Sequence, residues 1–409
     1  MAKRLALKLL AVSVGCVIAA VVAEGAMRLW NPFETRLRGD RIVLPASKTY
    51  IFADHGLSGV DPTITHTKNS LGFRGPELPS GGLNRHLSVV TVGGSTTECL
   101  FLSDDKSWPG VLQELLEEDL GSVWLNNAGL EGHSTFGHEI LMNEYVVRIR
   151  PTIVVFLIGL NDVGTTGPTD HALSQVKGGI RFGSPRRFLR SLAAYSDAVA
   201  VAFEVYRYSR ARMKGLPHRN IDFRAVPQLT YPEPRLQTEI ERHQAEYLPG
   251  YRRRVTELLA ISRRNGIIPV LVTQPVLFGG ATDPTTGVDL GGVGVSGQAG
   301  HTKWTVLELY NDVTRRIGEE HDVLVIDLAA ELPKDSRYFY DFYHFTNDGA
   351  RAVATVIHRH LAGYVDANHL DAGSSQIANT ARGAAPGGDR HSGNAPVDRP
   401  PSHLQVASE

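Results

Sequence analysis

Short apolar runs rich in β-branched residues alternate along the chain with longer segments of helical periodicity. Each run ends in a glycine or a polar residue, as expected of strands buried in a sheet. The predicted strands are Val89–Gly93, Val123–Asn127, Ile153–Gly159, Ile267–Thr273 and Val323–Leu328. The predicted helices are Trp108–Leu120, Ile140–Ile149, Tyr251–Asn265, Trp304–Glu320 and Ala350–Val365. This alternation predicts an α/β fold: a three-layer α/β/α sandwich with a mostly parallel sheet.

One long segment, residues 164–250, interrupts the alternation. Its apolar positions fall at helical spacing and have arginines on both sides. These apolar positions are Phe188, Leu192, Tyr195, Val199, Ala202 and Tyr206. The arginines are Arg186, Arg187 and Arg190 before them, and Arg207, Arg210 and Arg212 after them. We interpret the pattern as a helix packed on the domain, and the sharper alternative is a lid or a membrane-facing helix near the active site.

The amino terminus has the pattern of a signal sequence or a signal anchor. Three cations, Lys3, Arg4 and Lys8, precede an apolar run over Leu9–Ala23. The run is shorter than the roughly 20 residues of a full span. It lengthens towards Trp30 if Glu24 and Arg28, one helical turn apart, form an ion pair. We therefore expect a transmembrane helix with the basic end in the cytoplasm and the rest exported.

Cleavage of this segment is the alternative. Val21–Ala23 would make an acceptable cleavage site, and the protein would then be secreted. Cys16 follows Gly15 as in a lipoprotein signal, but Ser13 fits that pattern poorly and the apolar run continues past the cysteine. We favour an uncleaved single-pass anchor with the catalytic domain in the periplasm or outside the cell.

Composition and charge narrow the class of protein further. The chain has 409 residues, 42% of them hydrophobic and 21% charged, enough for a sizeable core in one large domain or two. Its net charge of −1 gives no reason to expect a nucleic-acid partner. Cys16 and Cys99 are the two cysteines, so no disulfide framework is implied.

The expected organisation is an anchor over residues 1–30, a membrane-proximal connection over 31–86, a catalytic domain over 87–365 with the insertion at about 164–250, and a disordered tail over 366–409.

Four polar segments follow the predicted strands or precede the last helix. They are Gly93–Ser95, Asn127–Ser134, Gly159–Asp162 and Asp341–Gly349. Because the carboxyl ends of parallel strands meet at one edge of a sheet, we expect these segments to converge there.

Their residue types suit acyl transfer, which needs a hydroxyl nucleophile, a base, a group that orients the base and donors for an oxyanion. Ser95 supplies the hydroxyl and His344 the base, since imidazole titrates near neutral pH. Asp341 lies three residues before His344 and can accept its other ring N–H. The backbone N–H groups of Ser95 and Gly132 and the side-chain amide of Asn161 are the predicted oxyanion donors.

In this order, the segments resemble the SGNH (GDSL-type) hydrolases. The family carries a nucleophilic serine, a glycine, an asparagine in a Gly-x-Asn-Asp motif and an Asp-x-x-His pair. The resemblance covers about Leu87 to Val365, apart from the insertion, and Asn69–Gly75 also looks like membrane-anchored bacterial members. It implies a flavodoxin-like fold and hydrolysis of esters or thioesters without a metal or an organic cofactor. One departure is Gly94, where the family's name motif has aspartate, and the choice of Gly132 over Gly129 as oxyanion donor is the weaker assignment.

Competing motifs are less complete. His138-Glu139 begins like a zinc-protease helix, but Met142 stands where the second histidine is required. Gly292–Gly297 matches a dinucleotide fingerprint formally, but it follows no strand directly, so we interpret it as a flexible surface loop. Gly132-His133-Ser134 resembles a nucleophile elbow, but Phe136 replaces its second glycine. No metal, organic cofactor or nucleic acid is expected.

The sequence therefore predicts a serine-dependent esterase that acts outside the cytoplasm on an O-acylated glycan or lipid. An O-acyltransferase would use the same residues, because both reactions need the same acyl-enzyme. A membrane-anchored binding or assembly protein with an inactive hydrolase fold is the third possibility. Such a binder has no need of a matched nucleophile and base, which counts against it.

Overall fold

A twisted parallel sheet lies at the centre of the molecule. The computed structural model describes residues 2–29, 37–38, 41–53, 55–167, 192, 195–202, 205 and 218–370. Over these residues, five parallel strands pair in the order β11-β8-β7-β5-β6. The strands are β5 (Leu87–Gly93), β6 (Val123–Asn127), β7 (Ile153–Leu157), β8 (Ile268–Val272) and β11 (Val325–Ile326). The order of connections reverses between β5 and β7, as in flavodoxin-like sheets, and confirms the predicted fold.

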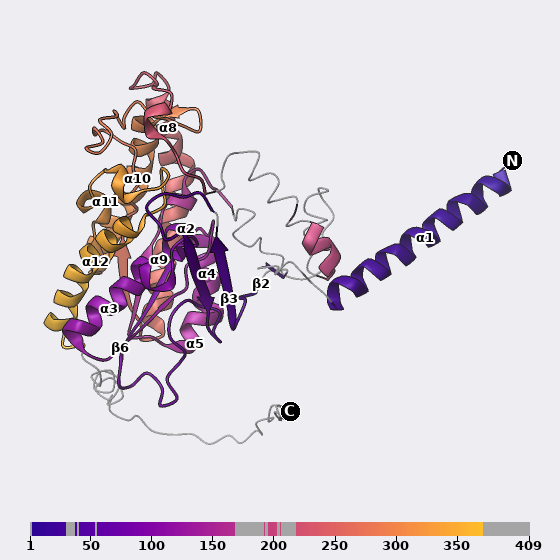
Figure 1. Cartoon of the computed structure of the whole chain (residues 1–409), viewed down its shortest axis with the longest axis horizontal. Coiled ribbons are helices and arrows are strands. Elements are labelled where there is room, and N and C mark those ends of the chain that lie inside the picture. The colour runs from indigo at the N-terminus through magenta and orange to yellow at the C-terminus, as the bar shows by residue number, and fades with distance from the viewer. Residues whose placement is uncertain are drawn as a thin grey trace, which may run out of the picture.

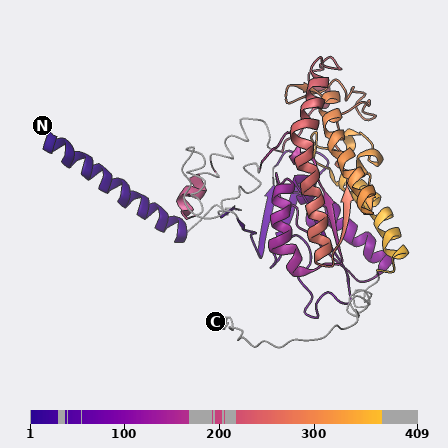
Figure 2. The same cartoon turned by 180° about the vertical axis from the view of Figure 1, so that it is seen from behind.

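Helices cover both faces of this sheet (Figures 1 and 2). On one face lie α3 (Trp108–Leu120), α11 (Leu328–Glu331) and α12 (Asn347–Ala367). On the other lie α4 (Thr135–Leu141), α5 (Val147–Ile149), α9 (Leu248–Arg264) and α10 (Gly300–His321), and α8 (Leu236–Arg242) precedes α9. The helices predicted over residues 108–120, 251–265, 304–320 and 350–365 are all present, three of them with longer ends.

Side chains of the central strand alternate between the two layers. Ile153, Val155 and Leu157 of β7 face the layer of α3 and α12, whereas Val154 and Phe156 face the layer of α9 and α10. All of them are fully buried, as predicted for a central parallel strand.

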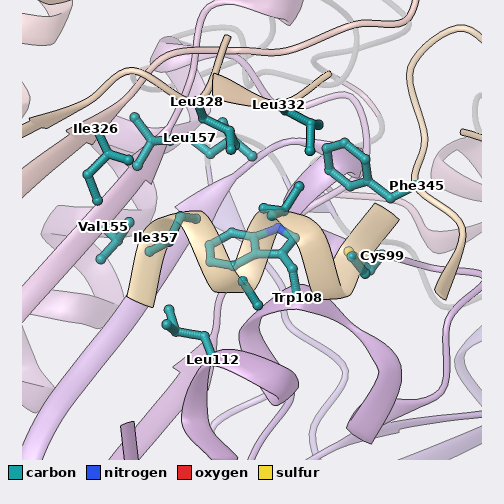
Figure 3. Close-up of a cluster of buried hydrophobic side chains, with 14 of the residues drawn as sticks. Cys99, Trp108, Leu112, Val155, Leu157, Ile326, Leu328, Leu332, Phe345 and Ile357 are labelled. Carbon is teal, nitrogen blue, oxygen red and sulfur yellow. The ribbon is translucent and has the colours of Figure 1, made fainter. Parts of the chain in front are cut away.

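One buried aromatic residue connects this core to the loop at the sheet edge. Figure 3 shows Trp108 of α3 among Leu157 of β7, Ile326 of β11 and Ile357 of α12. Its indole N–H donates to the carbonyl of Thr96, 3.0 Å away, in the short helix α2 (Ser95–Glu98). Replacing such a tryptophan by alanine typically costs about 3–5 kcal/mol. The core therefore anchors α2 directly.

Two of the differences from the predicted element boundaries have a clear local cause. The helix predicted from Ile140 begins five residues earlier, at Thr135, and passes through a π-helical turn (Met142–Val146) into α5. Its first turn has no apolar periodicity because the buried side chains there include the polar Thr135 and His138. The last strand is shorter than predicted, because Leu328 already begins α11.

The glycine-rich segment near residue 292 is not a surface loop, and that interpretation is wrong. Strand β9 (Gly294–Val295) pairs with β10 (Gln298–Ala299) in a small antiparallel hairpin. Val293 and Val295 are buried against the core around α3 and α12. The apolar residues between the glycines, rather than the glycines themselves, decide its placement.

The amino-terminal helix α1 (Ala2–Leu29) extends away from the sandwich (Figure 1). Its apolar part, Leu10–Leu29, has a mean hydropathy of 2.1 and is not buried by the rest of the protein. By length and composition this part is sufficient to cross a membrane. Arg28 donates to Glu24 at 2.7 Å, the ion pair expected to lengthen the apolar run.

Short hairpins connect α1 to the sandwich. Strands β1 (Leu37–Arg38) and β2 (Arg41–Ile42) pair with each other, as do β3 (Lys48–Ala53) and β4 (Thr63–Lys68). The segment after β4 lies against the sheet, where the N–H of Arg74 donates to the carbonyl of Asn127 at 3.0 Å. Of the amphipathic segment in the insertion, Phe188, Tyr206 and the flanking arginines lie outside the described residues, as does the tail beyond residue 370.

Candidate active site

Ser95 lies at the carboxyl end of β5, in the first position of α2. Close packing requires the two glycines before it. A Cβ on Gly93 would lie 2.7 Å from the carbonyl oxygen of Leu157. A Cβ on Gly94 would lie 2.3 Å from Nδ2 of Asn161. Because neither position has room for a side chain, the turn brings Ser95 beside the end of the neighbouring strand β7.

Three side chains from distant parts of the chain form one hydrogen-bonded series. Nε2 of His344 lies 2.9 Å from Oγ of Ser95, across a separation of 249 residues. Nδ1 of the same ring lies 2.7 Å from Oδ2 of Asp341. The other oxygen of Asp341 accepts from the N–H groups of Tyr343 and His344, at 2.8 and 2.7 Å. The structure thus brings together the residues predicted as nucleophile, base and orienting carboxylate.

The charge state of Asp341 sets the direction of these hydrogen bonds. Burial raises the pKa of Asp341, but the adjacent His344 ring and the two backbone N–H donors outweigh burial, so the pKa lies below its ordinary value. The carboxylate is therefore ionised at neutral pH and acts as an acceptor. A neutral His344 then carries its proton on Nδ1, which leaves Nε2 to accept the proton of Ser95.

Asn161 lies in a 3-10 turn (Leu160–Asp162) directly after β7. Nδ2 donates to the carbonyl of His133 at 2.9 Å, which fixes the plane of the amide. Within the described residues Nδ2 has no other hydrogen-bond partner, so its second N–H is available to a ligand. The close approach of Gly94 places this amide beside the residue that precedes Ser95.

The loop between β6 and α4 contains both candidate oxyanion glycines, and their contacts differ. Gly129 is packed against α2, and its N–H donates to Oδ1 of Asn127 at 2.8 Å. Gly132 is half-buried with a φ of +69°, a conformation that favours glycine. Among the described residues the N–H of Gly132 has no acceptor. Gly132 therefore remains the better candidate for the oxyanion donor.

A buried ion pair holds the Asn161 turn against the first turn of α4. Asp162 accepts from the N–H of Thr135 and from Nη2 of Arg254, which is 3.1 Å away. Nε of Arg254 also donates to Oγ1 of Thr135 at 2.6 Å, and its guanidinium lies 3.8 Å from the ring centre of Phe136. Sequence reasoning missed Arg254, because one arginine among several on an amphipathic helix gives no signal of burial.

Arg74 stabilises the carboxyl end of α2, the short helix that begins with Ser95 and forms the serine turn. Sequence reasoning missed this role as well. Its guanidinium donates to the carbonyls of Glu98 and Cys99, at 2.6 and 2.8 Å, where α2 ends. It donates further to the carbonyl of Leu102 and to Asp104, both at 2.8 Å. The Phe-Arg-Gly motif before Pro76 was a signal that could have identified it.

The alternative nucleophile, Ser134, is poorly placed for chemistry. It is fully buried at the start of α4, and its hydroxyl has no hydrogen-bond partner within the described part of the chain. Because no base among the described residues is hydrogen-bonded to it, this hydroxyl is not activated.

In the described ranges, one group of side chains could hold a metal ion: the ligand atoms of His218, Asp341 and His344 lie within 4.8 Å of one another. Their donor atoms are already engaged. Nδ1 of His344 bonds Asp341, its Nε2 faces Ser95, and Nδ1 of His218 lies 2.6 Å from the hydroxyl of Tyr340. A metal would have to break the Asp341–His344 hydrogen bond, so these residues fit a proton relay better than a metal centre.

His218 was not predicted from sequence. The centre of its ring lies 4.0 Å from that of His344, with an angle of 42° between the ring planes. It lies within the insertion, and a lone histidine in a region without regular pattern gives no sequence signal.

A parallel sheet with a Ser-His-Asp series at its carboxyl edge is the arrangement expected of an SGNH hydrolase. The chain belongs to the GDSL-like Lipase/Acylhydrolase family, whose model matches residues 91–352. No curated protein matches the chain significantly.

Solved structures similar to this chain include esterases at low identity. The acetylxylan esterase Axe2 from Geobacillus stearothermophilus is 15% identical over 68% of this chain and 95% of its own, with a TM-score of 0.39. The α/β hydrolase LAE5 from the metagenome of Lake Arreo, Spain, is 14% identical over 68% of this chain and 96% of its own, with a TM-score of 0.37.

Proposed function

We propose that the protein hydrolyses carboxylic esters through an acyl-enzyme on Ser95. His344 is the general base, and Asp341 orients and stabilises its ring. The observation that carries the proposal is the continuous hydrogen-bonded series from Asp341 through His344 to Ser95, at 2.7 and 2.9 Å. A nucleophile, its base and an orienting group within hydrogen-bond reach are the geometric signature of covalent acyl transfer.

Acylation begins when Oγ of Ser95 attacks the carbonyl carbon of the ester and Nε2 of His344 takes the hydroxyl proton. The carbonyl oxygen gains a negative charge, which the amide of Asn161 and the N–H groups of Ser95 and Gly132 stabilise. When the tetrahedral intermediate collapses, the bond to the alkoxy oxygen breaks. His344 then gives its proton to the leaving alcohol.

Deacylation repeats these steps with water as the nucleophile. His344 takes a proton from water, the hydroxide attacks the acyl carbon, and Ser95 leaves with the proton from His344. If a sugar or lipid hydroxyl takes the place of water, the same residues transfer the acyl group instead of releasing an acid.

The substrate class and the location are part of the proposal. We infer that α1 is an uncleaved anchor, with Lys3, Arg4 and Lys8 in the cytoplasm and the catalytic domain, residues 87–365, outside it. An O-acylated envelope glycan and a lipid ester are both within reach of a domain held at the non-cytoplasmic face of the membrane. The connection over residues 31–86 would set its height above that surface.

A contact near the carboxyl end of α1 supports a fixed position of the insertion relative to the membrane. Glu24 accepts from the hydroxyl of Ser196 at 2.7 Å and from the N–H groups of Asp197 and Ala198, both at 3.2 Å. A carboxylate that accepts the first N–H groups of a helix caps it. The helical turn that begins in the insertion at Asp197 would therefore lie at the membrane surface, which favours the membrane-facing interpretation of the insertion.

The test is ester turnover on a graded panel. Purified protein is assayed with p-nitrophenyl esters of increasing chain length and with acetylated glycans, alongside the Ser95→Ala variant. We expect turnover in the wild type and none above background in the variant. Equal turnover in both would refute the assignment, whereas acyl transfer to an added sugar in preference to water would identify the transferase.

A further inference from the structure

His218 lies where the insertion returns to the sandwich, and its ring packs directly on the proposed base. Its side chain is only 5% exposed. The ring centres of His218, His344 and Tyr340 form a triangle with sides of 4.0, 5.7 and 6.0 Å. Phe101, from the loop after α2, lies 5.0 Å from His218 on another side. The insertion thus contributes a buried aromatic ring to the proposed active site.

Both ring nitrogens of His218 face polar partners from other segments. Nδ1 lies 2.6 Å from the hydroxyl of Tyr340, and Nε2 lies 3.5 Å from Oε1 of Glu131. A neutral His218 satisfies both partners, because Tyr340 donates to Nδ1 while the N–H on Nε2 faces the carboxylate. Glu131 immediately precedes Gly132, and Tyr340 immediately precedes Asp341. One ring therefore links the oxyanion loop to the loop that carries the base.

Packing and charge at this position have different consequences for catalysis. The ring restricts His344 to the orientation in which Nε2 meets Ser95, and small displacements of a catalytic group are costly. A positive charge on His218 would have the opposite effect and hinder catalysis. His344 must become an imidazolium in both half-reactions, and a second imidazolium 4.0 Å away would oppose this strongly.

We propose that His218 is a positioning residue of the esterase, which fixes the orientation of the His344 ring. The inference rests on the proposed function of Ser95 and His344. The titratable groups that face His218 are Glu131 from the β6–α4 loop and Tyr340, Asp341 and His344 from the loop before α12.

Two substitutions separate the ring contact from the polar contacts. His218→Gln keeps an acceptor for Tyr340 and a donor for Glu131 but loses the ring that packs on His344. His218→Phe keeps a ring against His344 but loses both polar contacts. His360→Gln is the matched control, because His360 bonds Glu331 on the far helices α11 and α12.

The readouts are kcat and KM for p-nitrophenyl acetate, the rate of fluorophosphonate labelling of Ser95, and the melting temperature. We expect His360→Gln to match the wild type in all of them. His218→Gln, without the ring contact, and His218→Phe, without the polar contacts, should each lose about 10- to 100-fold in kcat with KM little changed.

A wild-type kcat in a folded His218→Gln would overturn the inference. So would a wild-type kcat in a folded His218→Phe. Absence of labelling in the wild type would instead refute the esterase itself, so the two failures are distinguishable. Should His218→Phe not fold, the kcat of His218→Gln decides alone.

Discussion

The residue before the nucleophile shows how closely the parts of the site depend on one another. Gly94 stands where the family's name motif has aspartate, yet nothing in the site needs that carboxylate. The amide of Asn161 occupies the space that a side chain at position 94 would take. The glycine at position 94 is therefore what allows the amide of Asn161, a proposed oxyanion donor, to approach so closely.

Restoring the motif should consequently damage this protein. In Gly94→Asp the new Cβ would have to displace Nδ2 of Asn161, which it would otherwise meet at 2.3 Å. We expect kcat to fall by about 10²–10³-fold, as for Asn161→Ala, because one oxyanion donor is lost. Gly81→Asp is the control, since nothing lies within 4 Å of a Cβ at that position. Steady-state kinetics of all three variants would test this, and an active Gly94→Asp would show that Asn161 is not needed where the structure has it.

The ionised side chain of Asp341 predicts how the stability of the fold depends on pH. Its pKa is lower in the folded protein than its ordinary value of about 4, so its ionised form stabilises the fold at neutral pH. That contribution is complete above about pH 4 and is lost as the pH falls through the lowered folded value. The stability difference between wild type and Asp341→Asn should therefore shrink in acid below pH 4, as measured by urea unfolding. A difference that stays constant with pH would contradict the assigned charge.

At the scale of elements, periodicity predicts the layers well and the site only in part. Strand ends and helices follow from apolar spacing, and Ser95, Asn161, Asp341 and His344 follow from their places after those elements. The start of α4 could not be predicted, because its first buried residues are polar. Nor could the roles of Arg254 and His218, since each depends on a contact between segments that are distant in sequence.

The prediction at the scale of elements concerns the contacts of Arg74. Its side chain is 2% exposed and donates to three carbonyls at the end of α2 and just after it. Arg74→Ala would leave those carbonyls and Asp104 without their donor, and a buried acceptor left unsatisfied costs about 1–3 kcal/mol. We expect a loss of at least that size in the free energy of unfolding. Arg85→Ala, at an exposed position, should change it by less than about 0.5 kcal/mol. Equal effects of the two substitutions would show that the Arg74 contacts do not stabilise the serine turn.

At the scale of the whole molecule, the proposed location depends on α1 and on its contact with the insertion. The apolar part of α1 spans 20 residues, and Glu24 at its base bonds the insertion. The sandwich alone gives no indication of location. The arrangement predicts a protein whose active site faces the exterior at a set distance from the bilayer.

An uncleaved anchor predicts a specific mature chain. Alkaline extraction of cell membranes should leave the protein in the pellet, and its intact mass should include residues 1–23. Ile18→Arg places a charge at the centre of the span at a cost of about 2.5–3.5 kcal/mol and should weaken that retention. A soluble chain that begins near residue 24 would contradict the anchor and indicate secretion.

The central claim is that His344 activates the hydroxyl of Ser95 for attack on an acyl carbon. Peptide mass spectrometry after reaction with a fluorophosphonate tests it most directly. The account predicts a single adduct on Ser95, absent in Ser95→Ala and formed orders of magnitude more slowly in His344→Ala. An adduct on Ser134, or labelling of Ser95 that does not change when His344 is removed, would contradict it.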